Sequence, residues 1–149
     1  MSAQCSNPQY DGVDLNRNFA KFWKGSDRCD DIYGGGRPFS EPETMAVKNY
    51  LLNRIKPRDS QYPHMDIQRA AIDAHSYSQV ILIPEDMPKR DKNIVERIGK
   101  AMRNAINGET YPVKTVSQFF DFESCRGSGS GFRANGTAMD WFYYGAGAK

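Results

Sequence analysis

Cysteine and histidine are scarce in this 149-residue sequence, which has three cysteines and two histidines. No two cysteines have the C-x-x-C spacing, which argues against a zinc site built from cysteine pairs. Because the number of cysteines is odd, at least one of Cys5, Cys29 and Cys125 is unpaired or has its partner outside the sequence. From composition alone, three buried or free thiols are an alternative to any disulfide.

The sequence also lacks a dominant charge and any long apolar run. Its 20 lysines and arginines nearly balance 18 aspartates and glutamates, for a formal net charge of +2. That balance gives no reason to expect nucleic acid or an anionic membrane as a partner. No apolar segment has the length of a membrane span, and the first residues lack the basic and apolar regions of a signal peptide. The length is enough for one domain with a real core.

Hydrophobic spacing predicts helices and strands in alternation after a loop-rich beginning. Residues 1–39 are dense in Gly, Asp, Asn and Pro, which favours loop. At the next segment, Ser40 and Glu43 have the spacing of a capping box at the start of a helix. Strands that alternate with helices indicate an α/β fold with a mixed, partly parallel sheet flanked by helices. The predicted helices are 40–56, 89–107 and, as a short helix or turn, 138–144, and the predicted strands are 67–75, 80–83 and 111–120.

Two short motifs carry residue types that suit a binding site. The run Ile72-Asp73-Ala74-His75-Ser76-Tyr77-Ser78-Gln79 delivers a histidine to the end of a predicted strand, where imidazole is a good ligand for Zn²⁺. Upstream, Asn16 and Arg17 lie in G-V-D-L-N-R-N-F, and an arginine with an adjacent amide can bind a planar carboxylate. Taken singly, a structural histidine and a surface turn with a solvated arginine are the simpler interpretations.

Together, the two motifs closely resemble those of the zinc metallocarboxypeptidases of the carboxypeptidase A/B type, peptidase family M14. Two further segments are similar to that family, Tyr33-Gly34-Gly35 with Pro38-Phe39-Ser40-Glu41-Pro42-Glu43-Thr44, and Ala134-Asn135-Gly136-Thr137-Ala138-Met139-Asp140-Trp141. The resemblance implies that His75 is a zinc ligand and that Asn16 and Arg17 bind the terminal carboxylate of the substrate. It also implies a loop disulfide between Cys5 and Cys29.

By this resemblance, the protein is a secreted enzyme that uses Zn²⁺ to remove C-terminal residues from peptides or proteins. Phe132 occupies the position where relatives place a mobile tyrosine. Met139 stands before Asp-Trp, where an acidic residue favours basic C-terminal residues in relatives. A buried lysine beside a thioether would leave its charge unpaired, so Met139 predicts a preference for aromatic or aliphatic residues. The expected substrate-binding residues are Asn16, Arg17, Ser76, Tyr77, Phe132 and Met139.

Other parts of the family's active site are missing from the sequence. The two remaining zinc ligands would come from an H-x-x-E motif before Asn16, and the general-base glutamate would follow Lys149. One histidine cannot hold a catalytic zinc ion, which normally has three protein ligands. We therefore expect residues 1–149 to be an internal fragment of the catalytic domain, incomplete at both ends and inactive alone. Signal and propeptide segments would then lie upstream.

Two other functions compete with this interpretation. One is a non-catalytic pseudoenzyme that binds peptide C-termini through Asn16 and Arg17 but holds no metal. The other is a phosphate-binding protein that uses the glycines at 34–36 or 127–131. Neither glycine segment matches G-x-x-x-x-G-K-[ST] or G-x-G-x-x-G, so the phosphate-binding signal is weak.

Overall fold

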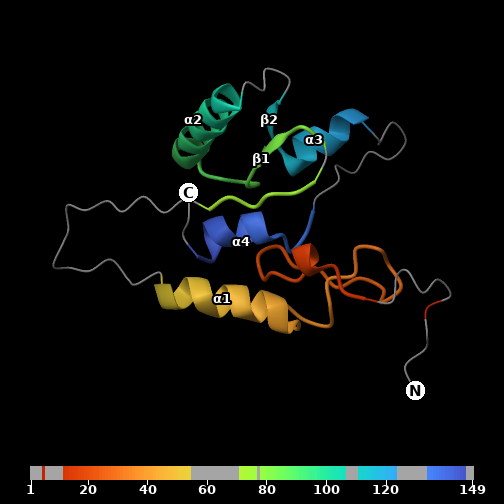
Figure 1. Ribbon diagram of the computed structural model, residues 1–149. Helices are drawn as coiled ribbons and strands as arrows, with labels where there is room; N and C mark the ends of the chain where they lie inside the picture. Colours follow the sequence, from red (N-terminus) through yellow and green to blue (C-terminus); the bar gives the residue numbers. More distant parts are fainter. Residues whose placement is uncertain are drawn as a thin grey trace. The chain divides into compact units, whose positions relative to one another are not determined.

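The chain forms two compact units, whose helices and strands are labelled in Figure 1. The computed structural model describes residue 5 and residues 12–54, 71–76, 78–106, 111–123 and 134–146. Unit 1 consists of Met1–Ala71 and Asn135–Ala148, and unit 2 consists of Ile72–Ala134 with Lys149. A segment from late in the chain therefore completes the unit that the first residues begin.

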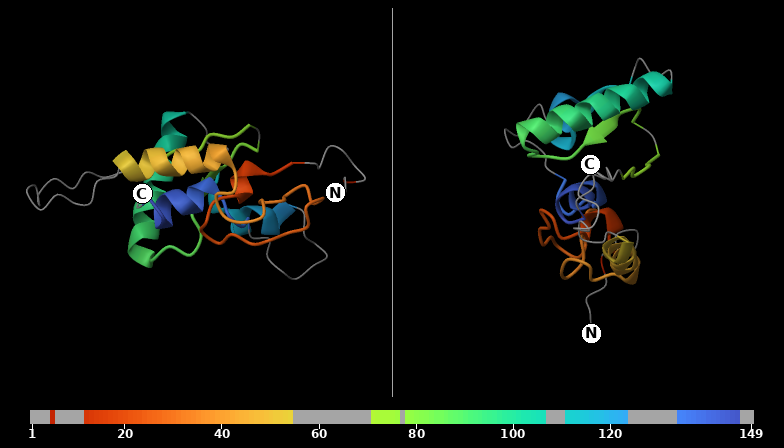
Figure 2. Two further views of the ribbon diagram at one scale, coloured as in Figure 1. Left: turned by 90° about the horizontal axis from the view of Figure 1, so that it is seen from below. Right: turned by 90° about the vertical axis from the view of Figure 1, so that its left-hand side faces the viewer.

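Unit 1 has an aromatic core between its loops and two helices. Phe19 and Phe39, both in loops, contact the Trp141 ring with centroid distances of 5.7 and 5.4 Å. Met45 and Leu51 pack against this cluster. They belong to the helix that lies alongside the late segment in Figures 1 and 2. Burial of these rings holds the early loops against the late segment of the chain. The elements of unit 1 are the 3-10 helix η2 (Leu15–Arg17) and the α-helices α1 (Pro42–Arg54) and α4 (Ala138–Tyr144).

The start of α1 is held by a residue from outside the helix. Asn18 is fully buried, and its Oδ1 accepts hydrogen bonds from the Glu41 backbone N–H at 3.3 Å and the Thr44 hydroxyl at 2.6 Å. In place of the predicted capping box, Ser40 Oγ accepts from Asn18 Nδ2 at 2.8 Å and donates to the Glu41 carboxylate at 2.7 Å. A tertiary contact thus supplies what a local cap would otherwise provide.

Unit 2 is a β-α-β arrangement followed directly by another helix. The two strands pair in parallel, with Ile81 opposite Val113 and Ile83 opposite Thr115. Because parallel neighbours require a long crossover, a helix runs between the strands and packs against both of them. This parallel pair with flanking helices confirms the predicted α/β class. The elements of unit 2 are β1 (Ile81–Ile83), α2 (Lys89–Ala105), β2 (Val113–Thr115) and α3 (Val116–Glu123).

The prediction of a strand at 67–75 is wrong for residues 71–75. Residues 67–70 lie outside the described residues. Residues 71–76 have no regular secondary structure and are exposed. Ile72, which the pattern placed in a buried strand, has 72% of its surface exposed. A strand requires a hydrogen-bonded neighbour, and the described sheet pairs only β1 with β2.

The predicted strand at 111–120 changes into a helix after three residues. Thr115 Oγ1 accepts from the Gln118 backbone N–H at 3.3 Å, and Gln118 Oε1 accepts from the Thr115 backbone N–H at 3.0 Å. This reciprocal pair is a capping box, and its T-x-x-Q spacing was present in the sequence. The buried Glu85 carboxylate adds bonds from the Ser117 backbone N–H at 2.7 Å and the Ser117 hydroxyl at 3.2 Å. Capping therefore outweighs the strand propensity of this apolar run.

At Gly99, helix α2 packs closely against the sheet. A Cβ added there would lie 2.8 Å from Val113 Cγ1 and 3.4 Å from Ile81 Cγ2.

No described helix combines the length and apolarity that crossing a membrane requires.

We expect Gly99→Ala to lower the free energy of unfolding by about 1 kcal/mol, because overpacking against the stiff Val113 side chain outweighs the helix propensity of alanine. Urea unfolding followed by circular dichroism measures the change. In a Val113→Ala background the same substitution should become neutral or stabilising, since the opposing methyl groups are gone. Equal destabilisation in both backgrounds would contradict this account.

Candidate functional site

The 3-10 helix η2 presents Asn16 and Arg17 from a tightly bonded turn. Asp14 precedes the turn in extended conformation, and its Oδ1 accepts from the Asn16 backbone N–H at 2.9 Å. The Asp14 backbone N–H donates to the Tyr33 carbonyl at 2.8 Å. The Asp14 cap therefore holds Asn16 and Arg17 on one short, irregular turn. A site in which two adjacent side chains contact the same ligand requires such a turn.

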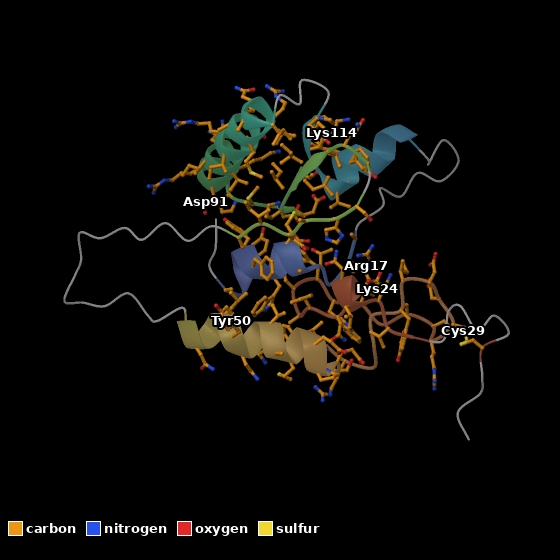
Figure 3. All side chains as sticks on the ribbon, in the orientation of Figure 1. Arg17, Lys24, Cys29, Tyr50, Asp91 and Lys114 are labelled. Carbon is orange, nitrogen blue, oxygen red and sulfur yellow. A yellow bond between two sulfur atoms is a disulfide. The ribbon has the colours of Figure 1, made fainter. Side chains whose placement is uncertain are left out.

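The Arg17 side chain, labelled in Figure 3, is held in place, yet one of its donors has no partner among the described residues. Its Nη1 donates to the Asn16 carbonyl at 2.8 Å. Its buried Nε has no hydrogen-bond partner in the part of the chain that the structure describes, and it lies 3.9 Å from Asp14 Oδ2, too far for a hydrogen bond. The whole side chain is 20% exposed. A buried donor without a partner costs about 1–3 kcal/mol, so an anion that reached this group would bind favourably.

The backbone of Arg17 is enclosed by two glycines from distant parts of the sequence. A Cβ added to Gly34 would lie 3.1 Å from the Arg17 carbonyl carbon. A Cβ added to Gly136 would lie 2.8 Å from the same carbon and would overlap the Arg17 carbonyl oxygen. Gly136 has φ +66°, and its carbonyl accepts from the Phe19 backbone N–H at 2.9 Å. Only glycine fits at this approach.

Helix α4 begins beside Asn16. The Ala138 backbone N–H donates to Asn16 Oδ1 at 2.8 Å, which orients the amide group. Thr137 caps the helix, since its Oγ1 accepts from the Asp140 backbone N–H at 3.2 Å and donates to Asp140 Oδ2 at 3.0 Å. Half-buried Met139 follows Ala138 in the chain. Unit 1 therefore brings Asn16, Arg17 and the start of the helix that carries Met139 together.

The histidine motif belongs to unit 2. His75 Nε2 lies 3.0 Å from Asp73 Oδ2, and the two side chains are 57% and 30% exposed. Ser76 is exposed, while Tyr77 and Phe132 lie outside the described residues. In the described part of the chain, no three His, Cys, Asp or Glu side chains are placed to hold a metal ion. These residues therefore do not complete a three-ligand zinc site, and the metal-binding role of His75 stays a prediction.

The predicted disulfide between Cys5 and Cys29 is present, with the two Cα atoms 5.5 Å apart (Figure 3). The bond closes a loop with a sequence separation of 24 that contains η2. In the chain-entropy model, closing such a loop contributes about 3 kcal/mol to stability. The bond therefore favours the folded state of the segment that holds Arg17. Cys125 lies outside the described residues.

Sequence reasoning missed two residues that shape the site, Asn18 and Gly136. Asn18 follows Arg17 in an Asn-rich loop, and nothing in its sequence neighbourhood indicates complete burial. Gly136 does have a local signal, because Asn-Gly commonly marks a turn with positive φ. The partner of that turn, the Arg17 backbone, could not be deduced from the signal.

The known proteins that this chain resembles are zinc carboxypeptidases and their relatives. The family described as zinc carboxypeptidase matches residues 2–149. Bovine carboxypeptidase B2 is 34% identical over 137 residues, which cover 89% of this chain and 29% of that protein. The inactive metallocarboxypeptidase ecm14 of Talaromyces stipitatus is 30% identical over 155 residues, which cover 93% of this chain and 25% of that protein. The chain thus spans under a third of the length of these relatives.

A solved structure has the same fold over most of the chain. Bovine thrombin-activatable fibrinolysis inhibitor, in complex with tick carboxypeptidase inhibitor, matches with a TM-score of 0.64 and 30% sequence identity. The match covers 89% of this chain and 42% of that one. With the family match across residues 2–149, these likenesses show that the chain belongs to the zinc carboxypeptidase family.

Proposed function

We propose that this chain binds the C-terminal carboxylate of a peptide, within a protein that removes aromatic or aliphatic C-terminal residues as a zinc carboxypeptidase. The observation that supports this most directly is the state of Arg17. Its guanidinium is held by the Asn16 carbonyl, and no described residue supplies a hydrogen-bond acceptor to its buried Nε. A carboxylate is a planar anion with two acceptor oxygens, and it matches the donor geometry of arginine.

The surroundings of Arg17 suit an anionic ligand with an apolar side chain. Asp14 Oδ2 is 3.9 Å from Arg17 Nε, which is beyond hydrogen-bond distance, so this donor stays available to the carboxylate of a ligand. The Asn16 amide is oriented by the Ala138 backbone N–H, at the start of the helix that continues with Met139. An apolar thioether near the ligand would favour an aromatic or aliphatic side chain over a charged one.

The binding half of this proposal is tested with small peptides. We expect the chain to bind an acetylated dipeptide that ends in phenylalanine at least about tenfold more tightly as the free acid than as the C-terminal amide, because the amide cannot form the charge-assisted pair. The dipeptide that ends in lysine should bind more weakly than its phenylalanine counterpart. Isothermal titration calorimetry measures all of these affinities. Equal affinity for the acid and the amide would refute the proposal.

Hydrolysis requires a metal ion, which would supply an activated water molecule when bound. His75, the only histidine among the described residues, is the proposed ligand from this chain. Since no group of three potential ligands lies in the described residues, we expect the chain alone, incubated with Zn²⁺, to leave a chromogenic C-terminal substrate uncleaved. Release of the chromophore at the rate of an ordinary carboxypeptidase would overturn this expectation.

A pseudoenzyme is the second candidate function. The relatives from Talaromyces stipitatus and Talaromyces marneffei, each 30% identical to this chain, are named inactive metallocarboxypeptidases. A protein of this kind would keep the carboxylate contact at Arg17 and lack turnover. The two candidates agree on binding of the free acid, so they differ only in whether the full-length protein with Zn²⁺ hydrolyses the same peptide.

We also propose that the protein is secreted. The disulfide between Cys5 and Cys29 supports this location, because such bonds form and persist in oxidising compartments. A free-thiol assay on protein purified from culture medium would find both of these cysteines unreactive until a reductant is added.

A further inference from the structure

Asn18 is the residue directly after Arg17, and its side chain joins the turn to the 34–44 segment of unit 1. Its exposed fraction is 0%, which is unusual for a polar side chain. The Nδ2 group donates to the Gly34 carbonyl at 2.7 Å, the Arg37 carbonyl at 3.1 Å and Ser40 Oγ at 2.8 Å. The Oδ1 atom accepts from the start of α1, as described above. The amide therefore uses both its donor end and its acceptor end.

These bonds hold the 34–44 segment against the turn that carries Arg17. The backbone of Asn18 adds to the contact, since its carbonyl accepts from the Phe39 backbone N–H at 2.7 Å. Its own N–H donates to the Leu15 carbonyl at 3.2 Å and so closes the turn. Gly34, whose carbonyl accepts from Asn18, is also one of the two glycines that enclose the Arg17 backbone. The position of Gly34, and through it that of Arg17, thus depends on the Asn18 amide.

We propose that Asn18 is the positioning residue for Arg17, and that it fixes the guanidinium where a peptide carboxylate can reach it. This inference rests on the carboxylate-binding function proposed above. Asparagine suits the role because a carboxylate at this position would turn an acceptor oxygen toward the acceptors at Gly34, Arg37 and Ser40. An apolar side chain of similar size would leave the same buried groups without partners.

Two substitutions test the proposal, Asn18→Asp as the larger perturbation of the Asn18 hydrogen bonds and Thr44→Val as the smaller one. The first removes the donor end of the amide, and the second removes only the Thr44 hydroxyl that donates to Oδ1. Asn49→Asp is the matched control, because Asn49 is an exposed residue of α1 and undergoes the same chemical change. Circular dichroism establishes which variants fold. If Asn18→Asp does not fold, Thr44→Val decides the test alone.

The decisive readout is the ratio of the dissociation constants for the amide and the acid forms of the phenylalanine dipeptide. A lower folded fraction weakens both ligands equally, so a purely structural role would leave this ratio unchanged. We expect the ratio to fall about tenfold in Asn18→Asp and about threefold in Thr44→Val, because a displaced guanidinium no longer meets the carboxylate, and to stay constant in Asn49→Asp. An unchanged ratio in a folded Asn18→Asp or Thr44→Val variant would overturn the proposal.

A second readout separates this proposal from the function on which it rests. If the unsubstituted chain does not prefer the acid, the carboxylate-binding function fails, and the position of Arg17 is then read from its Nε–H proton by nitrogen-15 NMR. That buried proton should exchange with water about tenfold faster in Asn18→Asp than in the unsubstituted chain and in Asn49→Asp. Equal exchange rates in all three proteins would show that Asn18 does not position Arg17.

Discussion

Replacing Arg17 with glutamine is expected to weaken binding of a peptide's free C-terminal carboxylate about 100-fold, since the charge-assisted pair with a half-enclosed guanidinium is lost. Affinity for the corresponding C-terminal amide should change much less. Isothermal titration calorimetry of both ligands against both proteins measures the four values. The substitution removes the bond from Arg17 Nη1 to the Asn16 carbonyl, but it also removes a buried Nε donor that has no partner among the described residues. Because these two effects oppose each other, we expect the free energy of unfolding to change little.

Arg97→Gln is the control for this experiment. Arg97 is an exposed residue of α2, and its replacement removes the same charge at a position outside unit 1. We expect it to leave both affinities unchanged, apart from a small effect of net charge that salt screens. A comparable loss in Arg97→Gln would mean that general electrostatic attraction, and not a carboxylate site at Arg17, explains the preference for the acid.

Gly136→Ala is expected to lower the free energy of unfolding by about 3–4 kcal/mol, from the strain of a positive φ and from overlap with a fixed backbone. The added Cβ would overlap the Arg17 carbonyl oxygen and lie 3.0 Å from the Phe19 carbonyl oxygen. Backbone atoms on both neighbours leave no flexible side chain that could move away. Urea unfolding followed by tryptophan fluorescence measures the loss, because Trp141 is buried in the core of unit 1.

Gly12→Ala provides the matched control for the loss of a glycine. A Cβ added to Gly12 would meet no atom of the described residues within 4 Å, and the residue is exposed. Its substitution should be neutral, or slightly stabilising through the lower conformational entropy of the unfolded chain. If the two variants unfold at the same denaturant concentration, the close approach of Gly136 to Arg17 does not contribute to stability.

The elements that sequence analysis located correctly are those with strong local patterns. Helix α2 follows from apolar residues at helical spacing, and β1 follows from a short apolar run that ends at Pro84. The errors arose where apolar spacing was ambiguous. The run at 71–75 is exposed and irregular, and the run after Thr115 is helical because a capping box begins a helix there.

Motifs identified the residues of the candidate site, and the structure decided how they are held. The predicted pairing of Cys5 with Cys29 is confirmed, and Asn16 and Arg17 do share one tightly bonded turn. Nothing in the sequence predicted the unsatisfied donor on Arg17 or the bond from the Ala138 backbone N–H to Asn16 Oδ1. Those features depend on segments that are far apart in the chain.

The sequence by itself determined the residue types, the helical and strand periodicities, the family and the chemistry that an adjacent asparagine and arginine can perform. Only the tertiary structure decided that Asn18 is fully buried and that Gly34 and Gly136 enclose the Arg17 backbone. The physical reason is that periodicity and propensity act over a few neighbouring residues. Burial, hydrogen-bond satisfaction and close backbone approach are instead set by whichever distant segments folding brings together.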